Sequence, residues 1–163
     1  MINFARRMKK PPLFAHILTT GFGSGYCPLA PGTAGAVLAV LLWLLASLWL
    51  TPVVLFYTTL AVILLFTVLG IVCTNQVIPF WGEDPRRVVV DEMVGVWIPL
   101  AVVNPGEWLY IIASLVLFRF FDIVKPLGVR KMENLPGGIG VMADDILAGI
   151  YSLVIILIAK CVL

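Results

Sequence analysis

The sequence predicts an all-α protein, a polytopic membrane helical bundle of about five membrane helices with a glycine-rich amino-terminal segment. Of its 163 residues, 61% are hydrophobic and 12% are charged, whereas soluble domains contain about 45–50% apolar and about 25% charged residues. The apolar residues also occur in long runs, and at roughly 20 residues per crossing the chain has room for about five. We therefore expect one membrane-embedded domain over residues 1–163.

Turn residues divide the chain into its predicted elements. Thr51-Pro52 separates the first two apolar runs, residues 75–87 form a polar stretch, and Asn104-Pro105-Gly106-Glu107 is a tight turn. We expect an amino-terminal segment over residues 1–34, followed by helices at about 35–50, 53–73, 88–103, 108–124 and 143–163.

The positions of Lys and Arg predict the sidedness of the bundle. Short loops rich in these residues stay in the cytoplasm, and here basic residues alternate with turns that have none. We therefore expect a cytoplasmic amino terminus, five crossings and an external carboxyl terminus. The basic residues are Arg6, Arg7, Lys9 and Lys10 in the amino-terminal segment, Arg86 and Arg87 in the second loop, and Lys125, Arg130 and Lys131 in the fourth.

Five of the nine acidic residues fall at the cytoplasmic ends of three predicted helices. Asp91 and Glu92 begin the third, Asp122 lies near the end of the fourth, and Asp144 and Asp145 begin the fifth. Carboxylates in membrane segments are costly, and several together repel one another unless cations accompany them. The sequence thus predicts an acidic cluster at one depth on one side of the membrane.

Arg119 and Lys125 lie three residues to either side of Asp122 on the same helix face and neutralise only part of this charge. We expect a divalent metal ion to neutralise the rest of the negative charge, and a set of oxygen ligands favours Mg²⁺ or Mn²⁺ over zinc. Taken singly, the acids are equally well explained as helix caps or intrahelical ion pairs. Their convergence at one depth favours a functional site.

Neighbouring residues on a helix point about 100° apart, so one member of each acidic pair is expected to face the metal. We expect Asp91, Asp122 and Asp145 to bind it directly. Glu92 is expected beside them at the metal site, where it or Asp144 would act as the base that orients water.

The amino-terminal segment contains a run of glycines ahead of the first long helix. Backbone N–H groups in such loops and at helix starts bind phosphate oxygens, and this predicts phosphate contacts from Gly23, Ser24, Gly25 and Thr33 together with Arg119 and Lys125. The plainer interpretation is a simple juxtamembrane turn, but its predicted position on the acidic side favours binding.

Four motifs, in order along nearly the whole chain, resemble the phosphatidylglycerophosphatase A family. They are GFGSG-x₂-P-x₂-PGT-x-G from Gly21, VVDEMVG-x-W from Val89, FRFFDIVKP from Phe118 and PGGIGVMADDILAG from Pro136. The resemblance implies a Mg²⁺-dependent phosphatase of the bacterial inner membrane, acting at its cytoplasmic face. Such an enzyme converts the lipid phosphatidylglycerophosphate into phosphatidylglycerol and phosphate in phospholipid biosynthesis. It also implies catalytic roles for Asp91, Glu92, Asp122, Asp144 and Asp145, with the first three and Asp145 at the metal.

Two other functions use similar acidic residues. A cation transporter or channel would carry acids through the full depth of the membrane, whereas only Glu107 is predicted on the outer side. A CDP-alcohol phosphotransferase needs a D-x₂-D-G-x₂-A-R pattern, which neither acidic pair begins. For a phosphatase, both attack by water and a covalent aspartyl-phosphate stay open. The net charge of +2 gives no indication of a nucleic-acid partner.

Overall fold

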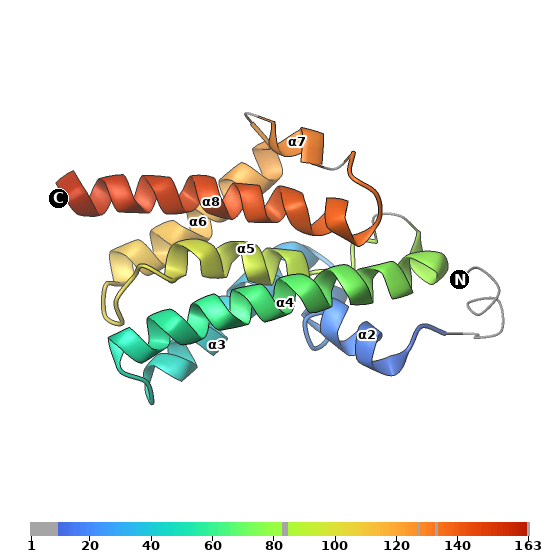
Figure 1. Ribbon diagram of the computed structural model, residues 1–163, viewed down its shortest axis with the longest axis horizontal. Helices are drawn as coiled ribbons and strands as arrows, with labels where there is room; N and C mark the ends of the chain where they lie inside the picture. Colours follow the sequence, from blue (N-terminus) through green and yellow to red (C-terminus); the bar gives the residue numbers. More distant parts are fainter. Residues whose placement is uncertain (1–9, 83–84, 127, 133, 163) are drawn as a thin grey trace.

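The structure, a computed structural model, describes residues 10–82, 85–126, 128–132 and 134–162. The basic residues Arg6, Arg7 and Lys9 and the terminal Leu163 lie outside these ranges. The described chain is helical and contains no strand (Figure 1), which confirms the all-α prediction. Its elements are α2 (Leu13–Thr19), the 3₁₀ turn η1 (Ser24–Tyr26), α3 (Pro31–Ser47), α4 (Pro52–Trp81), α5 (Val90–Leu100), α6 (Trp108–Val124), α7 (Val129–Met132) and α8 (Gly138–Val162).

The core is built around α5, which packs against α3, α4, α6 and α8. Nine of its eleven residues are buried. Glycines bring its neighbours close, because a Cβ at Gly95 would meet the ring of Phe118 and a Cβ at Gly149 would meet the carbonyl oxygen of Gly95. Trp97 Nε1 donates a hydrogen bond to the carbonyl of Ala39 at 2.9 Å. The protein thus encloses α5 on all sides.

Two helices, α4 and α8, are long and apolar enough to cross a membrane. Only 17% and 28% of their most apolar windows are buried inside the protein, so most of their apolar side chains face outward. The apolar helix α3 is shorter, with 17 residues. The predicted third crossing, 88–103, contains only the eleven-residue α5, which is about 16 Å long against a hydrocarbon core of about 30 Å. The count of about five crossings therefore stays a prediction.

Three helix boundaries differ from those predicted. Helix α4 continues through residues 75–81, predicted as a loop, and contains Pro79 two residues before its last residue, Trp81. Helix α3 begins at Pro31, a residue type favoured at the first helical position. Helix α8 begins at Gly138, whose N–H donates to Asn75 Oδ1 at 2.8 Å. Asp144 and Asp145 consequently lie in the second turn of α8 rather than in its first.

The glycine-rich segment folds back against the start of α5. Gly21 and Gly23 have φ angles of 50° and 98°, which L side chains rarely adopt, and these turn the chain between α2 and η1. The N–H of Val89 donates to the carbonyl of Thr19 at 2.8 Å. A Cβ at Gly25 would meet the carbonyl of Arg87. The segment therefore supports the residues that lead into α5.

The bundle has two distinct ends. The first residues of α3, α5 and α8 and the last residues of α4 lie at one end, and the α3–α4 and α5–α6 turns lie at the other with the carboxyl terminus (Figure 1). At the second end, Lys160 Nζ donates to Glu107 Oε2 at 2.7 Å and to the carbonyl of Val102 at 2.9 Å. This hydrogen bond from Lys160, with one from the N–H of Asn104, lowers the pKa of Glu107 to about 2.

Candidate active site

A cavity of about 740 Å³ opens at the first end of the bundle. It lies where α5 and α8 begin and α6 ends, so residues distant in the sequence share one wall. All five acids predicted from the sequence line it, as do the predicted cations. These seven lining residues are Asp91, Glu92, Arg119, Asp122, Lys125, Asp144 and Asp145.

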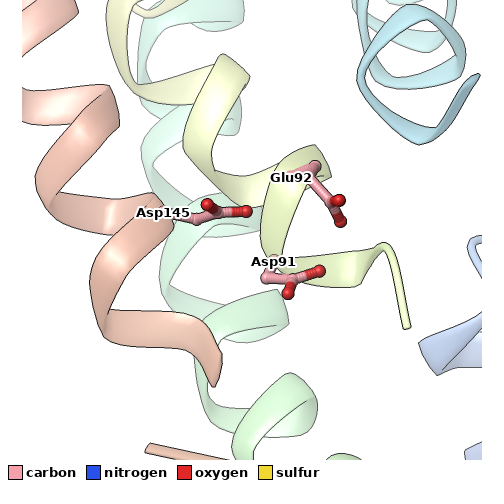
Figure 2. Close-up of side chains that lie close together, drawn as sticks. All are labelled: Asp91, Glu92 and Asp145. Atoms are coloured by element: carbon pink, nitrogen blue, oxygen red, sulfur yellow. The ribbon is translucent and has the colours of Figure 1, made fainter. Parts of the chain in front are cut away.

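Three of the acids form a compact group. Ligand oxygens of Asp91, Glu92 and Asp145 all lie within 4.8 Å of one another, and Figure 2 shows Asp145 pointing from α8 toward the first turn of α5. Asp91 Oδ1 and Glu92 Oε2 are buried and have no hydrogen-bond partner in the described part of the chain. Buried, unpartnered carboxylate oxygens are costly unless a cation is near. The three residues therefore fit a hard divalent ion such as Mg²⁺.

The two acidic pairs contribute unequally to this group. Asp145 belongs to the group and Asp144 does not, whereas Asp91 and Glu92 both contribute to it. The longer Glu92 side chain reaches back into the space left by Gly32, where a Cβ would meet Glu92 Oε1. A glycine on another helix thus lets two neighbouring acids share one site.

Arg119 connects the group to Asp122. Its Nη1 donates to Asp122 Oδ2 at 2.5 Å and lies 3.8 Å from Glu92 Oε1. Asp122 lines the same cavity as Asp145. Asp122 thus lies beside the three-residue group, and its predicted role as a metal ligand stays a prediction.

Lys125 and Asp144 form a second ion pair in the cavity. Lys125 ends α6 in the left-handed conformation, with φ 49°, and its Nζ donates to Asp144 Oδ2 at 2.7 Å. The other carboxylate oxygen, Asp144 Oδ1, is buried and accepts no hydrogen bond from the described residues. Asp144 therefore lines the cavity with one carboxylate oxygen held by Lys125 and the other buried and unsatisfied.

The residues of the glycine-rich segment that were predicted to contact phosphate do not lie at the cavity. Gly23, Ser24, Gly25 and Thr33 are not among the described residues that line the cavity, and the Ser24 hydroxyl donates to the carbonyl of Gly21 at 2.9 Å. The segment reaches the cavity instead through Ala30, Pro31 and Gly32. Arg119 and Lys125 do line it, so two of the six predicted phosphate-binding residues are brought together with the acids.

Besides Gly32 and Gly140, three polar or glycine positions that line the cavity were not assigned to the site from the sequence. These are Arg86, Asn134 and Gly137. Arg86 lies only five positions before Asp91 in the sequence. This proximity could have assigned it to the site, but its charge served only to predict sidedness. Asn134 and Gly137 come from the loop ahead of α8, and no pattern in the sequence distinguishes them from ordinary turn residues.

Comparison with known proteins bears on this site. Residues 17–160 match the family described as phosphatidylglycerophosphatase A. A Bacteroides thetaiotaomicron protein named "Putative phosphatidylinositol-3-phosphatase" is 56% identical over 158 residues, covering 96% of this chain and 99% of that protein. No solved structure matches the chain.

Two further relatives carry the family name. The phosphatidylglycerophosphatase A of Haemophilus influenzae is 38% identical over 143 residues, which cover 86% of this chain and 85% of that protein. The Escherichia coli protein of the same name is 36% identical over 139 residues, covering 84% and 78%. The family match, over residues 17–160, includes every residue of the acidic cavity described above. This protein therefore belongs to the phosphatidylglycerophosphatase A family and is a phosphatase.

Proposed function

We propose that this protein hydrolyses the terminal phosphate of phosphatidylglycerophosphate to give phosphatidylglycerol and phosphate, in a Mg²⁺-dependent step of phospholipid biosynthesis. The observation that supports this most is the group of Asp91, Glu92 and Asp145 with two buried, unpartnered oxygens, in a cavity that Arg119 and Lys125 also line. The acids of this group gather at one end of α5 rather than along the bundle, which gives no support to an ion path. Family membership agrees with the same reaction.

The phosphate would be bound between the acidic group and the two cations. Asp91, Glu92 and Asp145 would hold the Mg²⁺ ion, which when bound supplies positive charge for the phosphoryl oxygens. Arg119 and Lys125 donate charged hydrogen bonds at the cavity wall, and a phosphate oxygen arriving there would share these donors. Such preorganised donors stabilise the charge that spreads over the phosphoryl group during transfer.

Asp144 is the best-placed acid to orient the attacking water. Lys125 holds one of its carboxylate oxygens, while the other, Oδ1, is buried without a partner among the described residues and belongs to a residue that lines the cavity. That oxygen would accept a hydrogen bond from water and then its proton, as the water oxygen bonds to phosphorus and the P–O bond to the alcohol breaks; the protonated Asp144 would return this proton to the departing alkoxide. A covalent aspartyl-phosphate is the alternative, and acid-quench trapping of phosphorylated protein distinguishes the two.

The proposed location is the bacterial inner membrane, with the cavity facing the cytoplasm. The apolar outer faces of α4 and α8 would leave the acyl chains of the substrate in the bilayer, while only the head group reaches the acids. Arg86, Lys125, Arg130 and Lys131 lie beside or after helices that end near the cavity, in agreement with a cytoplasmic position.

The test is phosphate release from phosphatidylglycerophosphate by purified protein, with Mg²⁺ and with a chelator. The wild-type protein should need Mg²⁺, and Asp122→Asn should lower the rate about 100-fold or more, because it removes the carboxylate that holds Arg119. Glu107→Gln is the matched control, since Glu107 lies at the opposite end of the bundle. Chelator-independent activity, or a folded Asp122→Asn protein with the wild-type rate, would contradict the proposal.

A second candidate substrate follows from the 56% identical relative, whose name describes a phosphatidylinositol-3-phosphatase. Phosphatidylinositol 3-phosphate also carries a terminal phosphomonoester on an alcohol that a phosphodiester joins to diacylglycerol. The same assay with this lipid gives a second kcat/KM. We assign the function to phosphatidylglycerophosphate, and a higher kcat/KM for the inositol lipid would overturn that assignment.

A further inference from the structure

We infer that Arg86 binds the internal phosphodiester of the lipid substrate and so forms a second phosphate subsite at the mouth of the cavity. The inference rests on the proposed function, because it needs a substrate with both a terminal phosphomonoester and a phosphodiester. It makes Arg86 a specificity-determining residue that separates phospholipid head groups from simple phosphomonoesters.

Arg86 lies between two hollows of the protein surface. It lines the active-site cavity, and it also lines an adjoining hollow of about 330 Å³ formed by Phe80, Trp81, Pro85 and Arg87. Pro85 and Arg86 are shared by both hollows. The exposed Arg86 side chain therefore lies where the acidic cavity meets an aromatic surface next to the end of α4.

The other cations near the cavity are already engaged. Arg119 donates to Asp122, and Lys125 donates to Asp144. The guanidinium of Arg87 lies 5.5 Å from the centre of the Tyr26 ring. Arg86 makes no ion pair or hydrogen bond with another described residue, so its guanidinium donors are available to a ligand at the cavity mouth.

The chemistry of the substrate places its second phosphate near this residue. When the phosphomonoester occupies the acidic cluster, the diester must lie toward the opening, because the acyl chains attached to it stay outside the cavity. A guanidinium offers two parallel N–H donors that match two phosphate oxygens. Trp81, which lines the adjoining hollow with Arg86, is a residue type that favours the water–lipid interface, where a diester lies.

Two ligands, each carrying one half of the head group, allow binding at the two phosphate subsites to be measured separately. Phosphatidylglycerol carries the diester without the monoester, and inorganic phosphate carries the charge of the monoester alone. Arg86→Gln is expected to raise the KM for phosphatidylglycerophosphate and the Ki for phosphatidylglycerol about tenfold, the effect of losing a charge-assisted hydrogen bond. The kcat and the Ki for inorganic phosphate should stay within about twofold of wild type, because Arg119 and Lys125 are untouched.

Arg130→Gln is the matched control. Arg130 is an exposed arginine of α7 that does not line the cavity, so the same loss of charge should leave all four constants unchanged. Arg86→Lys keeps the charge without the planar pair of donors and should fall between wild type and Arg86→Gln. Assays at fixed lipid-to-detergent ratio keep the surface concentration of lipid equal in all proteins.

Each outcome is decisive. An unchanged KM and an unchanged Ki for phosphatidylglycerol in Arg86→Gln would overturn the subsite. An equal rise in the Ki for inorganic phosphate would also overturn it, since Arg86 would then act on charge in general. If the wild-type protein released no phosphate from phosphatidylglycerophosphate, the proposed function would fail first, which is a different result from an active enzyme indifferent to Arg86.

Discussion

A methyl group at Gly149 would meet the backbone of α5 and is predicted to separate two walls of the active site. The Cβ of Gly149→Ala would approach the carbonyl oxygen of Gly95, with the carbonyl carbon at 3.2 Å and Ile98 Cδ1 at 3.0 Å. A backbone carbonyl within a helix cannot turn aside as a side chain does. Helices α5 and α8 must therefore move apart by about 1 Å to regain ordinary van der Waals contact.

The expected change in stability is smaller than the expected change in rate. Alanine favours a helix over glycine by about 1 kcal/mol, while overpacking costs about 1–3 kcal/mol, so the net loss should be at most about 2 kcal/mol. Asp145 lies four residues before Gly149, on the same face of α8. Moving it by about 1 Å from Asp91 and Glu92 should lower kcat/KM about 100-fold.

Gly70→Ala is the matched control for this prediction. Its Cβ would also meet an atom at short range, but that atom is Met142 Sδ at 2.7 Å, near the end of a flexible side chain that can rotate away. Thermal unfolding in detergent and phosphate release are measured for both variants. A folded Gly149→Ala protein with the wild-type rate would show that the spacing of α5 and α8 does not set the geometry of the acids.

Two further predictions concern the ends of the bundle. The hydrogen bond from Lys160, with one from the N–H of Asn104, lowers the pKa of Glu107 from 4.5 to about 2. The Lys160–Glu107 pair therefore stabilises the folded protein fully above about pH 5, and this stabilisation declines as the pH falls toward 2. The unfolding temperature of Lys160→Gln should accordingly fall less than that of wild type between about pH 5 and pH 3, and parallel curves would contradict this role. Asn75→Ala leaves the N–H of Gly138 without its acceptor and should destabilise the protein by about 1 kcal/mol, with kcat lowered more than KM is raised because α8 carries Asp144 and Asp145. Glutamine at position 75 restores an amide oxygen on a longer side chain and should recover part of the kcat, so an equal loss in both variants would argue against capping.

The overall class of the fold follows from composition and from the order of apolar runs. A run such as residues 53–73 has no charged residue and can bury its backbone N–H and C=O groups only by pairing them within a helix, and the structure contains it within α4. The ends of that helix were harder to predict. Pro79 reads as a breaker from the sequence, since a proline lacks the N–H donor and crowds the preceding turn, but the helix continues two residues past it to Trp81.

For the candidate site, the local sequence pattern predicted which acids gather, and packing between helices decided which of their oxygens meet. The positions of Asp91, Glu92, Asp122, Asp144 and Asp145 at corresponding helix ends predicted that they would gather, and all five line one cavity. Which oxygens meet could not be predicted, because that depends on contacts between helices. Gly32, on α3, leaves the space that Glu92 uses, as the clash of its added Cβ shows.

The amino-acid sequence alone determined that the chain is helical and that its carboxylates collect at one end, because hydrophobic runs and the charges beside them are local properties of the chain. Only the tertiary structure decided that both α5 acids, Asp91 and Glu92, meet Asp145, and that Arg86 rather than the Gly23–Gly25 turn lines the cavity. Those outcomes depend on how far apart two helices pack and how each is rotated about its axis. Residues more than fifty positions apart, such as Gly95 and Gly149, set these distances.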